Sequence, residues 1–171
     1  MKKEFTVQDA SAVADYVKSH WGYNPMTGIV TGRGGRPIGR TRPDGGLHCT
    51  VRIPKAGVMT AVLLHRAAWL IVTGSWPNHG VDHRDGDRSN NKWANLRPAT
   101  QSQNRQNLKP VTGNGVLRGC TRYYRKWKAQ IKVPGERAPR YLGLFATQEE
   151  AHAAYCAAKA ALHPFQPIQR Q

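Results

Sequence analysis

The N-terminal region of the chain shows the hydrophobic spacing of a helix, followed by turn-rich sequence. Apolar residues recur every three or four positions at Val7, Ala10, Val13, Ala14 and Val17. Thr6 and Asp9 fit a capping box ahead of them, so the pattern predicts a helix over residues 6–19. The turn residues "NPMTG" and the Gly- and Arg-rich sequence that continues to Gly46 predict loops and short strands.

A β-hairpin and a short helix are predicted next. In "LHCTVRI", residues 47–53, apolar and polar residues alternate with the period of a half-buried strand. "PKAG" then turns the chain into "VMTAVLL", which predicts a hairpin. The segment "HRAAWLIVTG", His65 to Gly74, combines helix formers with apolar residues and ends at a glycine, so we expect a short core helix there.

The C-terminal part of the chain predicts a second, small α+β module. "LKPVTGNG", Leu108 to Gly115, has the composition of a linker and no apolar period. Beyond it, "RGCTRYYRKWKAQIKV" and "PRYLGLF" predict three strands, and "TQEEAHAAYCAAKAAL" predicts a helix capped by Thr147 and Glu150. The expected division is a domain over residues 1–108 with its core at about 60–108, a linker over 109–115, and a domain over 116–171.

The charge of the chain points to a polyanionic partner. Twenty-six Lys and Arg stand against ten Asp and Glu, a formal net charge of +16, which makes nucleic acid the leading partner and an anionic membrane surface the rival. No apolar run approaches the roughly 18 residues of a spanning helix, and the N-terminus lacks the apolar region of a signal peptide, so we expect a soluble intracellular protein. Three widely spaced cysteines predict free thiols and no structural zinc site.

The stretch "VDHRDGDRSNNKWANLRPATQSQN", residues 81–104, concentrates acidic, imidazole and amide side chains in turn-rich sequence, and three interpretations compete. One is a calcium loop, in which Asp85, Asp87 and Ser89 fit the first ligand positions but Asn90 and Leu96 replace the required glycine and glutamate. A second is a solvated polar turn in which His83 is incidental. The third is a site for phosphodiester hydrolysis.

Phosphodiester hydrolysis needs a hard divalent cation and a base near neutral pKa. Asp82 offers a carboxylate for the cation and His83 an imidazole for the base. Neighbouring side chains of a strand point to opposite faces, so the two groups serve one site only where the strand ends, and "RDGDRSNN" provides that end. Thr100 and Gln103 fit a capping box that places Asn104 in the first turns of a following helix, where its amide oxygen suits a hard metal. Asn95 is expected to hydrogen-bond across the loop and to hold the imidazole in one tautomer.

The motifs "DH", "DG", "NN", "NL" and "QN" at these spacings resemble the HNH nuclease family, in particular the homing endonucleases of phages and group I introns. Together with "YNPMTGIV", "LHRAAWLIVTG" and "WP", the resemblance covers about residues 20–108. It implies a ββα-metal fold, Asp82 and Asn104 as ligands of Mg²⁺ or Mn²⁺, His83 as general base and Asn95 as the residue that orients it. His65 is expected to be a packing residue.

The second module is basic and aromatic. Residues 109–140 hold nine Lys and Arg against one acid, which indicates either a solvated basic face or a β-sheet in a DNA groove with Arg118, Arg122, Arg125 and Lys128 on DNA and Ile131 and Val133 on the helix. Residues 115–162, including "LGLFAT" and "AY", resemble the APETALA-type (ethylene-response-factor) DNA-binding domain. By that resemblance Trp127, Arg140 and Tyr141 are further DNA-binding residues.

These observations predict a site-specific, metal-dependent DNA endonuclease of α+β class, with a catalytic ββα-metal module preceded by a β-hairpin and helices, then a three-stranded antiparallel sheet packed on one helix. Its partner is double-stranded DNA. A monomer should nick one strand, and a double-strand break needs a dimer or a second encounter. The alternatives are a non-catalytic DNA-binding regulator and a nonspecific HNH nuclease. The resemblance implies a cytoplasmic, nucleoid-associated enzyme encoded by a phage or mobile element.

Overall fold

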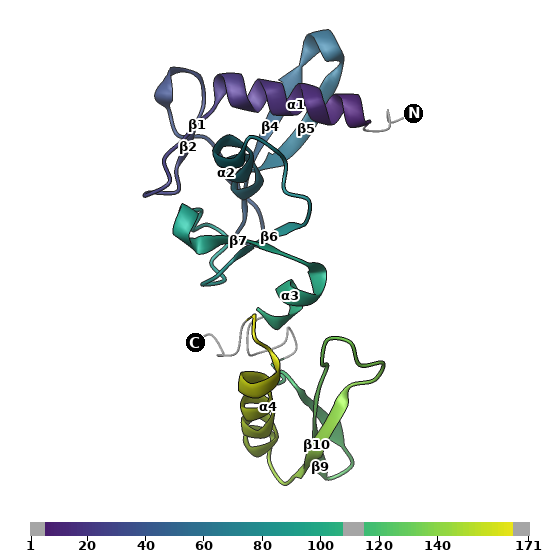
Figure 1. Cartoon of the computed structure of the whole chain (residues 1–171). Coiled ribbons are helices and arrows are strands. Elements are labelled where there is room, and N and C mark those ends of the chain that lie inside the picture. The colour runs from purple at the N-terminus through teal and green to yellow at the C-terminus, as the bar shows by residue number, and fades with distance from the viewer. Residues whose placement is uncertain (1–5, 108–114, 166–171) are drawn as a thin grey trace. The chain divides into compact units, whose positions relative to one another are not determined.

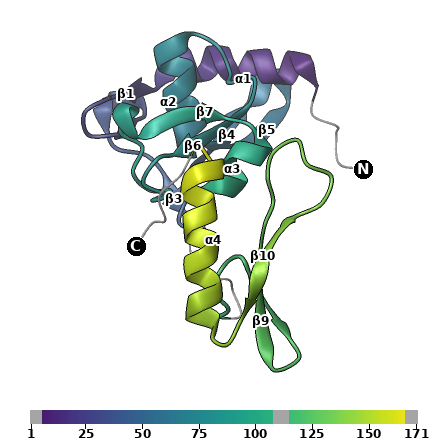
Figure 2. The ribbon, with the colours of Figure 1, turned by 60° about the horizontal axis from the view of Figure 1, so that its bottom comes forward.

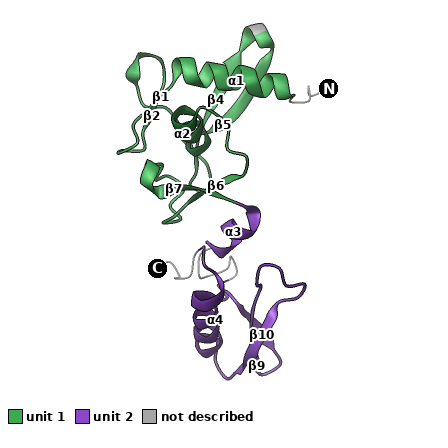
Figure 3. Ribbon diagram, viewed as in Figure 1, with its two compact units in different colours: residues 1–99 green, residues 100–171 purple. Residues whose placement is uncertain are grey.

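The protein forms two compact units, residues 1–99 and residues 100–171 (Figure 3). The computed structural model describes residues 6–107 and 115–165, without the side chain of Lys55. The expected linker over 109–115 lies, except for Gly115, outside the described residues. The first unit ends at Ala99, so the short helix over residues 101–106, which carries Asn104, belongs to the second unit.

The first unit combines two α-helices with short antiparallel strands. Its helices are α1 (Val7–His20) and α2 (Leu64–Thr73), with 3-10 turns η1 (Arg33–Gly35), η2 (Pro54–Ala56) and η3 (Trp93–Asn95). Its strands are β1 (Gly22–Tyr23), β2 (Val30–Thr31), β3 (Arg40–Thr41), β4 (Leu47–Ile53), β5 (Val58–Leu63), β6 (Gly80–His83) and β7 (Leu96–Ala99). The order of strands is β1-β2, β3-β4-β5 and β6-β7 in three separate sheets.

Helix α1 begins where the capping box predicts. The Thr6 hydroxyl accepts from the Asp9 amide at 3.2 Å, and the Asp9 carboxylate accepts from the Thr6 amide at 2.8 Å. Val13 and Val17 bury their side chains almost completely, which is what the three-to-four spacing requires of the inner helix face. The helix lies across the β4–β5 hairpin (Figure 1).

The β4–β5 hairpin and α2 complete the main core of the first unit. The hairpin pairs residues 48–53 with 63–58, and its inner residues Val51 and Val62 pack into the same cluster as α1. Helix α2 follows directly and ends at Gly74, whose φ of 79° gives the left-handed cap that the glycine predicted. A second, smaller cluster of Ala68, Val81 and Leu96 joins α2 to the β6–β7 ribbon.

The second unit contains the predicted three strands and helix, with one short helix before them. Its elements are α3 (Gln101–Gln106), β8 (Cys120–Tyr123), β9 (Lys126–Ile131), β10 (Arg140–Phe145) and α4 (Gln148–Leu162). The strands form an antiparallel sheet in the order β10-β9-β8, and α4 packs along β9 and β10 (Figure 2). Thr147 and Glu150 form the expected capping box at the start of α4.

The described residues contain no helix long and apolar enough to cross a membrane. Cys49, Cys120 and Cys156 are free thiols that are each partly buried. The helices and strands described above confirm the predicted segments of both modules. They include the strand at "VDH", the strand at "LRP" and the helix capped by Thr100 and Gln103.

Candidate active site and nucleic-acid interface

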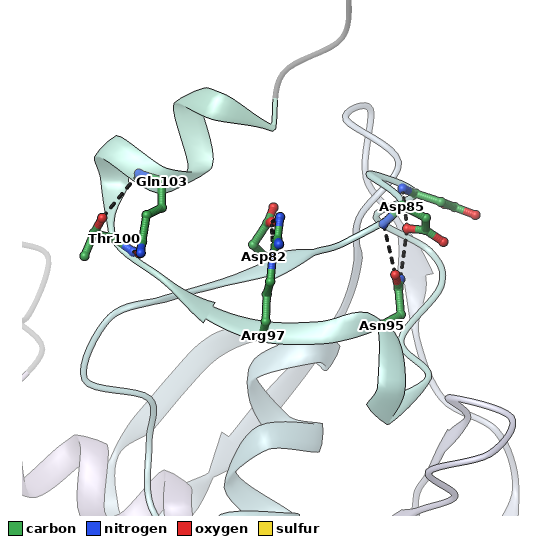
Figure 4. Close-up of polar contacts among 7 residues, drawn as sticks. Asp82, Asp85, Asn95, Arg97, Thr100 and Gln103 are labelled. Carbon is green, nitrogen blue, oxygen red and sulfur yellow. Dashed lines mark hydrogen bonds and ion pairs between the residues drawn. The ribbon is translucent and has the colours of Figure 1, made fainter. Parts of the chain in front are cut away.

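The β6–β7 ribbon positions Asp82 opposite Arg97. The antiparallel register pairs the two residues, and the Arg97 guanidinium donates to Asp82 Oδ2 from Nε at 3.0 Å and from Nη2 at 2.9 Å (Figure 4). Both side chains are nearly buried, with 12% of Asp82 and 14% of Arg97 exposed. The carboxylate therefore lies beside a permanent cation, and its oxygens are of the type that binds a hard metal ion.

His83 is the last residue of β6 and its imidazole is buried. Its Nε2 lies 2.9 Å from Oδ1 of Asn91, an oxygen that only accepts, so Nε2 carries the proton. This tautomer puts the lone pair of the neutral ring on Nδ1, and a general base needs such a lone pair to accept a proton. Strand alternation sends Asp82 and His83 to opposite faces, and the strand ends at His83 as expected.

The imidazole of His65, on α2, lies against His83. The ring centroids are 5.1 Å apart and the planes meet at 79°, an edge-to-face contact. Burial, followed by repulsion from His83 and three arginines, lowers the pKa of His65 to about 3. Its buried Nδ1 has no hydrogen-bond partner among the described residues. His65 is thus a neutral ring packed against His83, as expected of a packing residue.

Asn95 holds the loop after β6 and not the imidazole, which corrects the sequence-based role. Its Nδ2 donates to Asp85 Oδ1 at 2.9 Å and to the Asn90 carbonyl at 2.7 Å, and its Oδ1 accepts from the Asp85 amide at 3.0 Å (Figure 4). These bonds cross the loop as predicted. The hydrogen bond to His83 comes from Asn91, a residue that the sequence pattern did not single out and whose only signal was the "NN" pair.

The carboxylates of Asp85 and Asp87 accept hydrogen bonds from residues of their own loop. Asp85 accepts from the amide of Asp87 at 2.9 Å and from the side chain of Asn90 at 2.7 Å. Asp87 accepts from the amide and hydroxyl of Ser89, and these bonds lower the pKa of its carboxyl. Within residues 6–107 and 115–165, no three His, Cys, Asp or Glu side chains are grouped to hold a metal. Asp85 and Asp87 therefore act as turn residues, as the second interpretation of this stretch proposed for the loop.

Asn104 lies on α3, in the second unit. Thr100 and Gln103 cap this helix reciprocally, with the Gln103 side chain accepting from the Thr100 amide at 2.7 Å (Figure 4). The Oδ1 atom of Asn104 is buried and has no hydrogen-bond partner in the described part of the chain. A buried amide oxygen without a donor is costly unless it has a ligand, so this atom fits a role in binding a cation.

The register of the β8–β9–β10 sheet separates the predicted DNA-binding residues onto two faces. Arg122 pairs with Trp127, and Trp127 alternates with the buried Ala129 and Ile131 on the side of α4. Lys128 pairs with Thr121 on the opposite, outer face. Arg122 and Lys128 therefore lie on opposite faces of the sheet, because the β-hairpin turn has only two residues, and their expected contacts with DNA stay a prediction.

The outer face of the sheet carries polar and aromatic side chains. By the cross-strand pairs, it consists of Thr121, Tyr123, Lys126, Lys128, Gln130, Tyr141 and Leu144. Of the predicted residues, Lys128 and Tyr141 lie on it, whereas Trp127 and Arg140 share the face of α4, with Arg140 in an ion pair with Glu136. Arg125 is exposed in the turn, and Arg118 precedes β8 with its side chain partly buried. The guanidinium carbon of Arg122 lies over the Trp127 ring, 5.3 Å from the ring centroid.

The segment that contains Asp82 and His83 matches a known protein family. Residues 62–106, which include β6, β7, Asp82 and His83, match the family model of the HNH endonuclease. A solved structure of DNA binding and cleavage by the HNH homing endonuclease I-HmuI is similar, at 26% identity and a TM-score of 0.42 over 52% of this chain and 51% of that chain. The chain thus spans about half the length of that relative. No match was found among curated proteins. Residues 62–106 carry the sequence pattern of an HNH endonuclease.

Proposed function

We propose that the protein is a site-specific DNA endonuclease whose general base is His83. The observation that carries this proposal is the buried imidazole at the end of β6, held as the Nε2–H tautomer by Asn91, within the segment that matches the HNH endonuclease model. A solvated polar turn has no need of a buried histidine in one tautomer. The neutral ring accepts a proton at Nδ1 from the attacking water.

The rest of the active site follows from the ribbon and the helix after it. Asp82, paired with Arg97, supplies a carboxylate ligand, and Asn104 stays the second proposed ligand on the strength of its sequence position and its buried Oδ1. When bound, a Mg²⁺ or Mn²⁺ ion would neutralise charge on the phosphate and on the leaving oxygen. Asn91 orients the base, and Asn95 braces the loop after β6. The ββα-metal arrangement is proposed on the sequence resemblance.

The second unit supplies the DNA affinity in this proposal. Residues 109–171 carry eleven Lys and Arg against three acids, and the outer face of the sheet offers Lys126, Lys128 and Tyr141 to a DNA groove. The APETALA-type resemblance supports the same use of a three-stranded sheet. With one active site per chain, we expect a monomer that nicks one strand of double-stranded DNA. The resemblance also supports action on the nucleoid by a product of a phage or mobile element.

The proposal is tested by incubating the purified full chain with supercoiled plasmids that carry its own genetic neighbourhood. We expect Mg²⁺ to give nicked circles at a defined position, and EDTA to stop the reaction. Tight, sequence-selective binding without any cleavage in Mg²⁺ or Mn²⁺ would instead support the DNA-binding regulator. Cleavage at scattered positions on every plasmid would support the nonspecific nuclease.

A further inference from the structure

Asn91 can orient a catalytic base only if its own position in the loop is fixed by other residues. It follows His83 by eight residues in an irregular loop, yet its side chain is 1% exposed and its Oδ1 accepts from the imidazole at 2.9 Å. The hydrogen bonds of Asn95, Asp85 and Asp87 order residues 84–90 of this loop. Within the loop, the Asn91 amide donates to the Ser89 carbonyl at 3.1 Å, and further support, at the Asn91 carbonyl, comes from another element.

That support comes from the β1–β2 hairpin, more than sixty residues earlier in the chain. The Tyr23 hydroxyl donates to the Asn91 carbonyl at 2.7 Å, across a sequence separation of 68 residues. The Trp93 amide donates to the Pro25 carbonyl at 2.9 Å. Two hydrogen bonds therefore attach the hairpin to the chain on both sides of Lys92. Burial raises the pKa of Tyr23 to about 12, so its hydroxyl keeps its proton and stays a donor near neutral pH.

Gly28 brings the backbone of the hairpin turn directly against the same segment. A Cβ atom on Gly28 would lie 2.5 Å from the Lys92 amide nitrogen and 2.6 Å from the Asn91 carbonyl carbon. Both neighbours are backbone atoms, so no side-chain movement relieves such a contact. Gly28 also has a φ of 77°, in the left-handed region that disfavours side chains.

The hairpin turn that makes these contacts is itself ordered. The Gly28 amide donates to the Asn24 carbonyl at 2.8 Å, and the Asn24 amide donates to Ile29 at 3.0 Å. The Asn24 side chain accepts from the Met26 amide at 2.9 Å. Tyr23 and Trp93 also pack on the small core cluster behind the β6–β7 ribbon. The turn is therefore a fixed support and not a loose loop resting on the site.

We propose that the "YNPMTG" turn of the β1–β2 hairpin is a positioning device for the active site, in which Tyr23 and Gly28 fix Asn91 and Asn91 fixes the orientation and tautomer of His83. The proposal rests on the proposed function, because it takes His83 as the base. Asn91, Tyr23 and Gly28 are positioning residues and touch no reacting atom in this account.

The decisive comparison is between two glycines with nearly the same positive φ. Gly28 and Gly34 have φ of 77° and 78°, but a Cβ on Gly34 meets nothing within 4 Å. Gly28→Ala and Gly34→Ala therefore both put a side chain at a left-handed φ, and they differ in the collision with Asn91 and Lys92. We expect Gly28→Ala to lower the single-turnover cleavage rate about 10²-fold at saturating DNA, with an unchanged Kd for DNA, and Gly34→Ala to cleave like the wild type.

Hydrogen-bond variants test the same path without adding volume. Tyr23→Phe should lower the cleavage rate about 3- to 10-fold through the lost hydrogen bond to Asn91. Asn91→Ala should lower it about 10²-fold, and Asn91→Asp, whose carboxylate also accepts from Nε2–H, should recover most of that loss. If Gly28→Ala does not fold, Tyr23→Phe and the Asn91 pair decide the question alone.

A spectroscopic measurement separates this proposal from the proposed function. Long-range ¹H–¹⁵N NMR spectra of the full chain report the tautomer of His83 without any cleavage. We expect the Nε2–H tautomer in the wild type and in Gly34→Ala, and a mixture of tautomers in Asn91→Ala and Gly28→Ala. If the tautomer responds in this way and no variant cleaves DNA, the positioning device stands and the proposed function fails. Equal rates and equal spectra for folded Gly28→Ala and Gly34→Ala would overturn the positioning device.

Discussion

At the scale of single residues, the contact between two imidazoles decides what charge the candidate site can hold. His65 and His83 meet edge to face, and burial of His65 lowers its pKa to about 3. Because His65 stays neutral near pH 7, it adds no positive charge beside His83 when the base accepts a proton. A second protonated imidazole at 5.1 Å would oppose that step by electrostatic repulsion.

The depressed pKa of His65 makes folding stability depend on pH. The unfolded chain binds a proton at this residue below about pH 6.5, whereas the folded chain does so only near pH 3, so stability is lost as pH falls between these values. We expect His65→Gln to remove up to about 3 kcal/mol of the difference in unfolding free energy between pH 7 and pH 4. Urea unfolding at the two pH values measures it, with the exposed His79→Gln as control. If both variants reduced the pH dependence of the unfolding free energy equally, the lowered pKa of His65 would be contradicted.

The ion pair of Asp82 with Arg97 predicts that folding does not depend on the catalytic metal. The carboxylate already has a cationic partner at 2.9 Å in the fold, so removing a bound ion leaves no uncompensated charge. We expect EDTA to abolish cleavage and to shift the melting temperature by less than about 4 °C. Calorimetry with and without EDTA, followed by readdition of Mg²⁺, checks both effects. A much larger fall in the melting temperature would reveal a structural metal.

The candidate site was only partly predictable from the sequence. The adjacent Asp82 and His83 at a strand end, and the capped helix that carries Asn104, follow from local patterns that the fold preserves. Among the asparagines of the loop, however, the choice of Asn91 over Asn95 depends on how the loop folds back and on the hairpin that holds it. No local pattern contains the contact between Tyr23 and Asn91, because it joins residues 68 positions apart.

At the scale of elements, the turn between β8 and β9 decides which side chains face outward. Arg122 and Lys128 are an even number of positions apart, which would put them on one face of a continuous strand. The two-residue turn at Tyr124 and Arg125 reverses the chain, so that Tyr123 pairs with Lys126 and Arg122 with Trp127. Strand positions were therefore predictable from alternation, but the shared face of two strands was not, since it depends on the exact length of the turn.

The register predicts unequal roles for two basic residues of this sheet. Lys128→Ala should weaken DNA binding and reduce the slope of log K against log salt by about 0.9, the share of one phosphate contact. Arg122→Ala should change that slope less, because the guanidinium lies over Trp127 and donates to the Tyr124 carbonyl at 3.0 Å. Fluorescence anisotropy across a salt series compares them. The reverse order of effects would mean that the face of α4, and not the outer face, meets DNA.

At the scale of the whole molecule, the proposed function assigns chemistry to residues 1–108 and DNA affinity to residues 109–171. Asp82, His83, Asn91 and Asn95 all belong to the first unit, whereas residues 109–171 carry a formal charge of +8. A fragment of residues 1–108 retains Asn104 as well. The helices and strands of each unit were predictable because their signals are local, whereas the grouping of α3 with the second unit was not, because it depends on contacts far apart in the chain.

Deletion of residues 109–171 should separate targeting from cleavage. Loss of four phosphate contacts would flatten the salt slope by roughly 3.6 and weaken specific binding strongly. We expect slow and less selective nicking by the fragment, once circular dichroism shows that it is folded. Unchanged affinity and salt slope in the fragment would show that the second unit is not the DNA anchor, and would remove the support for an APETALA-type module.

The central claim, that His83 is the base of a metal-dependent DNA endonuclease, is tested most directly by comparing His83→Ala with His79→Ala on supercoiled target DNA in Mg²⁺. The exposed His79 lies four residues upstream of His83 and outside the hydrogen-bonded site, so it controls for loss of an imidazole alone. We expect His79→Ala to nick at the wild-type rate, and His83→Ala to nick about 10²- to 10⁴-fold more slowly while binding DNA with unchanged Kd. Wild-type cleavage by folded His83→Ala would contradict the assignment.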